Sequence, residues 1–120
     1  MKGNDDFEVL IDALKKRDEV LRKNQSVKKY NKYFVIMRKC ARNLIAQNRQ
    51  DELLPYLENE SISIKRDVAG LLFNSYPEEC RKVLQNISYM SMQTGLPECY
   101  INVSVSASMA LEVGIPKDFP

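Results

Sequence analysis

The chain has 120 residues, a length typical of one domain, and it excludes a two-domain enzyme or a large barrel. It is 44% apolar and 28% charged with a formal net charge of +2, which allows a hydrophobic core, and only four glycines and five prolines argue against a turn-rich β fold. The sequence contains no histidine, which removes every Ser-His or Cys-His catalytic pair and most zinc sites.

Two long helices are expected first. Residues 5–23 place apolar side chains at helical spacing, with acids at the start and bases further along, as the helix dipole favours. Residues 27–47 give the strongest pattern, because one apolar stripe runs through them at i, i+3 and i+4 spacing. Ser26 is expected to cap this second helix at its start, and Asn48 is expected to end it.

Three further helices are expected in the middle of the chain. A short one covers residues 51–57, with Pro55 near enough to its start to be tolerated. The next covers residues 62–74. The third continues to about Met90 from a capping-box pattern in which Ser75 and Glu78 bond reciprocally, with Pro77 in the first turn. Residues 90–97 are expected to form a loop.

The last segment, residues 98–112, is ambiguous. Ile101, Val103 and Val105 alternate with polar residues, which is the period of a strand. The same residues also fit a helix that ends at Gly114. We favour the helix, because all neighbouring elements are helical and a lone strand has no partner with which to pair.

These elements predict an all-α fold of about six antiparallel helices. We expect them to stack as HEAT-like helical hairpins in a single domain, residues 1–120, with its core over about residues 5–114. Residues 53–72 resemble one HEAT repeat. The first helix carries Leu53-Leu54-Pro55-Tyr56-Leu57, a polar turn follows, and the second helix carries Ile64-Lys65, Val68-Ala69 and Leu72.

A wider resemblance covers about residues 14–114. The order and spacing of Lys29-Tyr30-Asn31, Leu54-Pro55-Tyr56-Leu57, Val68-Ala69 and residues 76–84 are similar to those of a bacterial family of small HEAT-like proteins of unknown function. Small helical proteins of this kind occur as immunity proteins beside secreted toxins, including those of contact-dependent growth inhibition. By that analogy we expect a non-catalytic protein that binds a secreted toxin domain, such as a nuclease, and occludes it, without metal or cofactor.

Charge is unevenly distributed along the chain. Residues 20–50 contain nine bases and no acid, whereas residues 51–120 contain ten acids and five bases. Four of the bases fall within one stripe of the second helix: Lys28, Lys32, Lys39 and Arg42. We expect a solvated face compensated by acids on neighbouring helices. The alternative is a surface for a polyanion, which would make the protein a nucleic-acid-associated regulator.

Acidic residues supply the expected protein-binding site. Asp51 and Glu52 form one cluster, and Glu58 and Glu60 lie in the polar turn. We expect these four carboxylates to meet a basic toxin surface, since complementary charge speeds association. They lack the spacing of a metal loop.

The cysteines predict the compartment. Cys40, Cys80 and Cys99 are odd in number and widely spaced, so we expect free thiols in a reducing environment. The acidic N-terminus lacks the apolar stretch of a signal peptide, and the sequence has no apolar run of membrane-spanning length. We therefore expect a cytoplasmic protein. It also lacks a glycine-rich phosphate loop and a nucleophile elbow, so we do not expect an enzyme.

Overall fold

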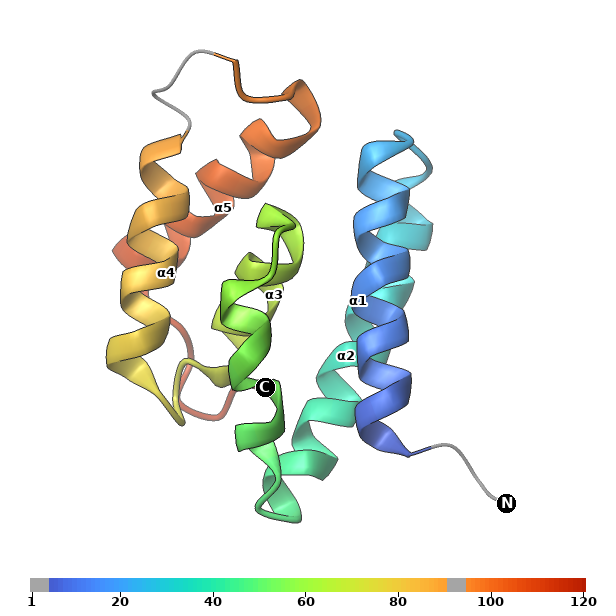
Figure 1. Cartoon of the computed structure of the whole chain (residues 1–120), viewed down its shortest axis with the longest axis vertical. Helices are drawn as coiled ribbons and strands as arrows, with labels where there is room; N and C mark the ends of the chain where they lie inside the picture. Colours follow the sequence, from blue (N-terminus) through green and yellow to red (C-terminus); the bar gives the residue numbers. More distant parts are fainter. Residues whose placement is uncertain (1–4, 91–94) are drawn as a thin grey trace. The chain divides into compact units, whose positions relative to one another are not determined.

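The computed structural model describes residues 5–90 and 95–120 and is all-α over those residues, with five α-helices and one 3-10 helix (Figure 1). The predicted fold class is therefore confirmed. The described chain divides into two compact units, residues 5–52 with Pro120 and residues 53–119. The HEAT-like stacking and the single-domain assignment stay predictions. Over the same residues, every helix is too short or too polar to cross a membrane.

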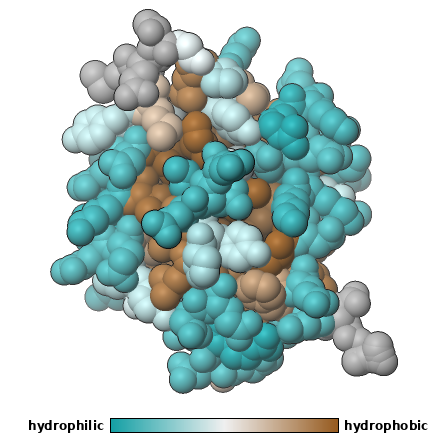
Figure 2. Space-filling view, in the orientation of Figure 1, coloured by the Kyte–Doolittle hydropathy of each residue, from teal (hydrophilic) through white to brown (hydrophobic). Residues whose placement is uncertain are grey.

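The first unit contains a helical hairpin. Helix α1 (Asp6–Arg22) packs against α2 (Val27–Ala46) (Figure 1). Their contact is built from apolar side chains at helical spacing, and the fully buried members include Leu10, Leu14, Met37, Ala41 and Leu44. In Figure 2, the right-hand edge of the view, on the side where this hairpin is drawn, is mostly hydrophilic.

Both helices of the hairpin begin and end with local hydrogen bonds. The N–H of Lys29 donates to Ser26 Oγ at 3.2 Å, which confirms the predicted cap of α2. After α2 the chain turns through Asn48 at φ 57°, and Arg49 N–H donates to the Leu44 carbonyl at 2.8 Å. This is a Schellman ending, and it confirms the role predicted for Asn48. Asn24, at φ 52°, ends α1 in the same way.

The segment after α2 differs from its prediction. It is a 3-10 helix, η1 (Gln50–Glu58), rather than a short α-helix, and Pro55 lies inside it rather than near its start. Proline has no N–H to donate to the carbonyl four residues earlier, so Pro55 disfavours an α-helix there. The tighter 3-10 geometry is a common form for such connectors.

The second unit holds three helices. These are α3 (Ile62–Leu72), α4 (Pro77–Met90) and α5 (Glu98–Val113), and α3 packs against the other two (Figure 1). The expected capping box at Ser75 is wrong. Because α4 begins at Pro77, Tyr76 is the residue before the helix, and its carbonyl accepts from Cys80 N–H at 3.1 Å. Proline favours the first helical position because its φ is already helical and it needs no partner for an N–H.

Helix α5 resolves the ambiguous segment. Residues 98–113 are helical, the strand alternative is wrong, and Gly114 ends the helix at φ 90°. The hydroxyl of Ser104, fully buried, donates to the carbonyls of Ile87 at 2.6 Å and Ser88 at 3.1 Å. These carbonyls belong to the last turn of α4, so the Ser104 hydroxyl joins α5 to the end of that helix. The expected loop over 90–97 falls in part on residues 91–94, outside the described residues.

Candidate protein-binding surfaces

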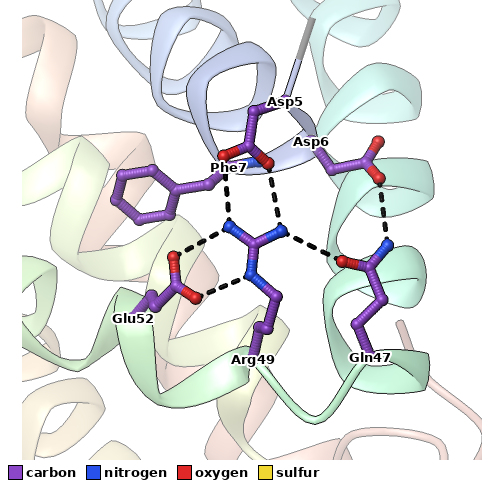
Figure 3. Close-up of polar contacts among 6 residues, drawn as sticks. All are labelled: Asp5, Asp6, Phe7, Gln47, Arg49 and Glu52. Carbon is purple, nitrogen blue, oxygen red and sulfur yellow. Dashed lines mark hydrogen bonds and ion pairs between the residues drawn. The ribbon is translucent and has the colours of Figure 1, made fainter.

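Arg49 lies at the centre of a polar network in the first unit (Figure 3). Its Nε donates to Glu52 Oε2 at 2.7 Å and its Nη2 to Glu52 Oε1 at 3.0 Å. Its Nη1 and Nη2 also donate to the two carboxylate oxygens of Asp5, each at 3.1 Å. One guanidinium therefore makes paired hydrogen bonds to two carboxylates, an arrangement that its planar fork permits and a lysine ammonium does not.

This network holds the beginning of α1 beside the segment that follows α2. Asp5 is also the N-cap of α1 and accepts from the N–H of Phe7 at 3.2 Å. The hydrogen bonds from Arg49 lower the pKa of Asp5 and of Glu52 and raise the pKa of Arg49 itself. The charges of Asp5, Arg49 and Glu52 therefore have a structural role in this unit.

The network changes the status of one predicted site residue. Glu52 is half-buried and already bonded to Arg49, so a partner would have to displace that bond. Asp51, beside it on η1, is exposed. Of the first predicted acidic pair, only Asp51 therefore has an exposed carboxylate that is not bonded to Arg49.

The second predicted acidic pair lies at the corner between η1 and α3 in the second unit. Glu58 and Glu60 are exposed, and neither is within ion-pairing distance of a cation in residues 53–90 or 95–119. Between and after them, Asn59 Oδ1 accepts from Ser61 N–H at 2.9 Å, and Ser61 Oγ accepts from Ile64 N–H at 3.2 Å. Ser61 is the N-cap of α3. The helix dipole favours a carboxylate beside the N-terminus of α3, which gives Glu60 a structural role that the sequence pattern did not suggest.

The basic stripe of α2 is exposed and differs from the bases on α1. In and directly after α1, three bases pair with acids four residues earlier: Lys16 with Asp12 at 3.0 Å, Arg22 with Asp18 at 2.9 Å and Lys23 with Glu19 at 3.5 Å. On α2, by contrast, three exposed lysines have no acidic partner within residues 5–52: Lys28, Lys32 and Lys39. The expected compensation by acids of a neighbouring helix is therefore absent within this unit.

Two other details of α2 bear on that stripe. Arg42 donates from Nε to the main-chain oxygen of Pro120, so it is partly engaged by the chain itself. Val35 is 65% exposed in the middle of the stripe. Because α2 turns by about 100° per residue, Val35 and the four bases lie within about 80° of one another.

Helix α5 carries an exposed apolar stripe that was not predicted from the sequence. Ile101, Val105, Met109 and Val113 follow one another at intervals of four residues and are 42%, 48%, 54% and 76% exposed. The opposite side of the same helix is buried through Val103, Ser104 and Ala107. The i+4 spacing of these apolar residues could have indicated the stripe. The alternation of apolar and polar residues, which suggested a strand, drew attention away from it.

The thiols are free. Cys40 and Cys80 are buried and Cys99 is half-buried, without a disulfide among them. Burial raises the pKa of Cys80 to about 12, which keeps it a neutral thiol.

Comparison with known proteins gives no relative for this chain. No family model matches it, and neither a curated protein nor a solved structure is significantly similar. The resemblance to a HEAT-like family stays an expectation from the sequence pattern, and the immunity role stays an analogy with it.

Proposed function

We propose that this protein is a non-catalytic binding module that acts in the cytoplasm as an immunity protein. In this proposal a helical surface covers the substrate site of a cognate bacterial toxin and supplies no chemistry of its own. The toxin domain would carry basic side chains around that site, as a nuclease does to hold phosphate.

The corner formed by Glu58 and Glu60 carries this proposal. Both carboxylates are exposed, and the backbone that presents them is fixed by the hydrogen bonds of Asn59 and Ser61. The second unit has eight acids against five bases over residues 53–119, so its own charge adds to the attraction for a basic partner. Preformed, unpaired charge of one sign speeds encounter with the opposite sign.

A binding experiment with a matched control tests the acidic corner. The proposal predicts a gene for a secreted protein directly upstream of this one, and the probe is the C-terminal domain of that protein. We expect Glu58→Lys with Glu60→Lys to slow association by about tenfold or more at low salt and by less at high salt. Glu78→Lys with Glu79→Lys makes the same change in net charge at another exposed acidic pair and serves as the control.

Two outcomes would count against the acidic corner. One is an association rate that does not change in the Glu58 and Glu60 variant. The other is an equal loss in the control variant, which would mean that only total charge matters. If the wild-type protein does not bind this domain, then the domain is not its partner and the proposed function loses its toxin.

A second candidate function uses the basic stripe of α2. Lys28, Lys32 and Lys39 are exposed and lack acidic partners in their unit, which suits a phosphate backbone. Against it, Arg17 lies over the ring of Tyr30, 3.8 Å from the centroid, and over that of Phe34 at 4.9 Å. Those rings are therefore packed by the hairpin and are poor platforms for a base.

Binding of transfer RNA at increasing salt tests this second candidate. We expect only weak binding at physiological salt, and little change when Lys28, Lys32, Lys39 and Arg42 are all replaced by Gln. Micromolar or tighter binding that falls steeply with salt, and that the four substitutions abolish, would favour the nucleic-acid function instead.

A further inference from the structure

The exposed face of α5 has acids at its ends and apolar residues between them. Glu98 and Glu112 are exposed near the two ends of the helix, and the apolar residues between them are Ile101, Val105 and Met109. At about 100° per residue these five side chains lie within about 80° of one another. A helix that buries one face and exposes a second apolar stripe has a surface that water does not favour.

The exposed face of α2 has the opposite charge at its ends and one apolar residue at its centre. Lys28 and Arg42 lie near its ends, Val35 lies midway, and Lys32 and Lys39 lie between. Because none of the three lysines pairs with an acid of its own unit, their charge is available to a partner.

The two faces match at three positions, the two ends and the centre. Lys28, Val35 and Arg42 are spaced by seven residues, and so are Glu98, Val105 and Glu112. Each face is therefore about 21 Å long with a valine at its centre. Laid side by side, they bring opposite charges together at both ends and Val35 beside Val105 at the centre, in either relative direction. The aliphatic parts of Lys32 and Lys39 then lie beside Ile101 and Met109.

We propose that the α5 face of one copy of this protein docks on the α2 face of a second copy. The partner is a second copy because this chain itself supplies the complementary face. Val35 and the apolar centre of α5 favour a helix over a phosphate backbone, which offers no apolar group at that position. Each copy has one face of each kind, so the contact is head-to-tail and extends into chains or closes into a ring.

The small size of the two faces limits the strength of the contact between copies. One helix against one helix buries less than the area of about 1,000 Å² that a stable interface needs. Exposed ion pairs each add little, and salt screens them. We therefore expect self-association that is weak, increases with protein concentration and decreases with added salt.

Sedimentation velocity of two variants tests the pairing. The α2 variant carries Lys28→Glu and Lys39→Glu, and the α5 variant carries Val105→Asp and Met109→Asp. We expect the wild-type protein to associate at high concentration and each variant alone to be monomeric. A mixture of the two variants retains one intact α5 face and one intact α2 face, so it should form a heterodimer that grows no further.

Controls separate the pairing from general charge and from misfolding. Lys15→Glu with Lys82→Glu makes the same charge change at exposed lysines outside both faces and should associate like the wild type. Circular dichroism confirms that each variant is helical, and Ile101→Ser with Val105→Ser replaces the α5 variant if that one does not fold. A monomeric wild-type protein at the highest concentration, or variants that do not combine in the mixture, would overturn the proposal. Transfer RNA binding lost in the α2 variant, without any self-association, would assign the face to nucleic acid and overturn it as well.

Discussion

Arg49 shows how much of the charge in this chain is used internally. Its guanidinium holds both Asp5 and Glu52, residues 44 and 3 positions away in the sequence. Glu52 lies next to Asp51 in the sequence, and this acidic pair predicted a site that binds a partner. Which acid meets which base depends on how the hairpin returns to its start, and a helical pattern carries no information on that.

We expect substitution of Arg49 to lower the stability of the protein in a pH-dependent way. Arg49→Gln removes the hydrogen bonds that lower the pKa of Asp5 and Glu52 below their ordinary values of 3.8 and 4.5. A lowered carboxyl pKa stabilises the folded state above the unfolded pKa, and this stabilisation is lost as the pH falls through the folded pKa. We therefore expect the variant to melt at a lower temperature than the wild type at about pH 7, and the difference to shrink towards about pH 3.

Two further variants check that assignment. Arg49→Lys keeps the charge without the double fork and should recover only part of the loss. Lys82→Gln removes one exposed positive charge that has no partner in the described residues and should leave the melting temperature unchanged. A melting difference for Arg49→Gln that stays constant with pH would show that Arg49 acts by packing rather than through the two carboxylates.

Helix ends were the best predicted elements, and the exceptions have physical reasons. Ser26, Asn48 and Gly114 were identified correctly because each ending depends on the residue type at one position. The start of α4 was predicted from Ser75, but the fixed φ of Pro77 decides it. The 3-10 form of η1 was missed, because its apolar residues fit either helix type.

Asn48 gives a test at the level of one helix ending. Its φ of 57° is in the left-handed region, where a Cβ is unfavourable. We expect Asn48→Ala to lower the free energy of unfolding by about 1 kcal/mol and Asn48→Gly to change it by less than about 0.5 kcal/mol. Ala46→Gly, in the last residue of α2, should instead destabilise, by about 0.5–1 kcal/mol. Urea denaturation measures all three, and equal losses for Ala and Gly at position 48 would contradict this account.

Ser104 tests how α5 is joined to α4. Its buried hydroxyl donates to two carbonyls in the last turn of α4. We expect Ser104→Ala to lower the free energy of unfolding by about 0.5–1.5 kcal/mol, because a buried hydrogen bond between the two helices is lost. The hydroxyl of Ser108 bonds only within its own helix, to the Ser104 carbonyl at 3.4 Å, so Ser108→Ala should cost much less. Similar values for the two variants in urea denaturation would show that the bonds to α4 contribute little.

The division of charge is a property of the whole molecule that the sequence does predict. Bases gather in residues 20–50, and only five of the 18 bases lie in residues 53–119, whereas the 16 acids divide equally between the two units. The compensation expected for the basic stripe could not be judged from counts, because pairing needs acids within about 4 Å and not merely in the same chain. The apolar stripe of α5 was missed for a related reason, since periodicity alone does not show which of two apolar faces is buried.

Growth of bacteria that express the neighbouring toxin domain tests the central claim most directly. The account predicts that co-expression of this protein restores growth, that Glu58→Lys with Glu60→Lys weakens the protection, and that Glu78→Lys with Glu79→Lys preserves it. The protection should require binding alone, with the toxin recovered chemically unchanged from the complex. Cells that stop growing despite full expression of the folded protein, or a toxin recovered in modified form, would contradict an immunity protein that acts by occlusion.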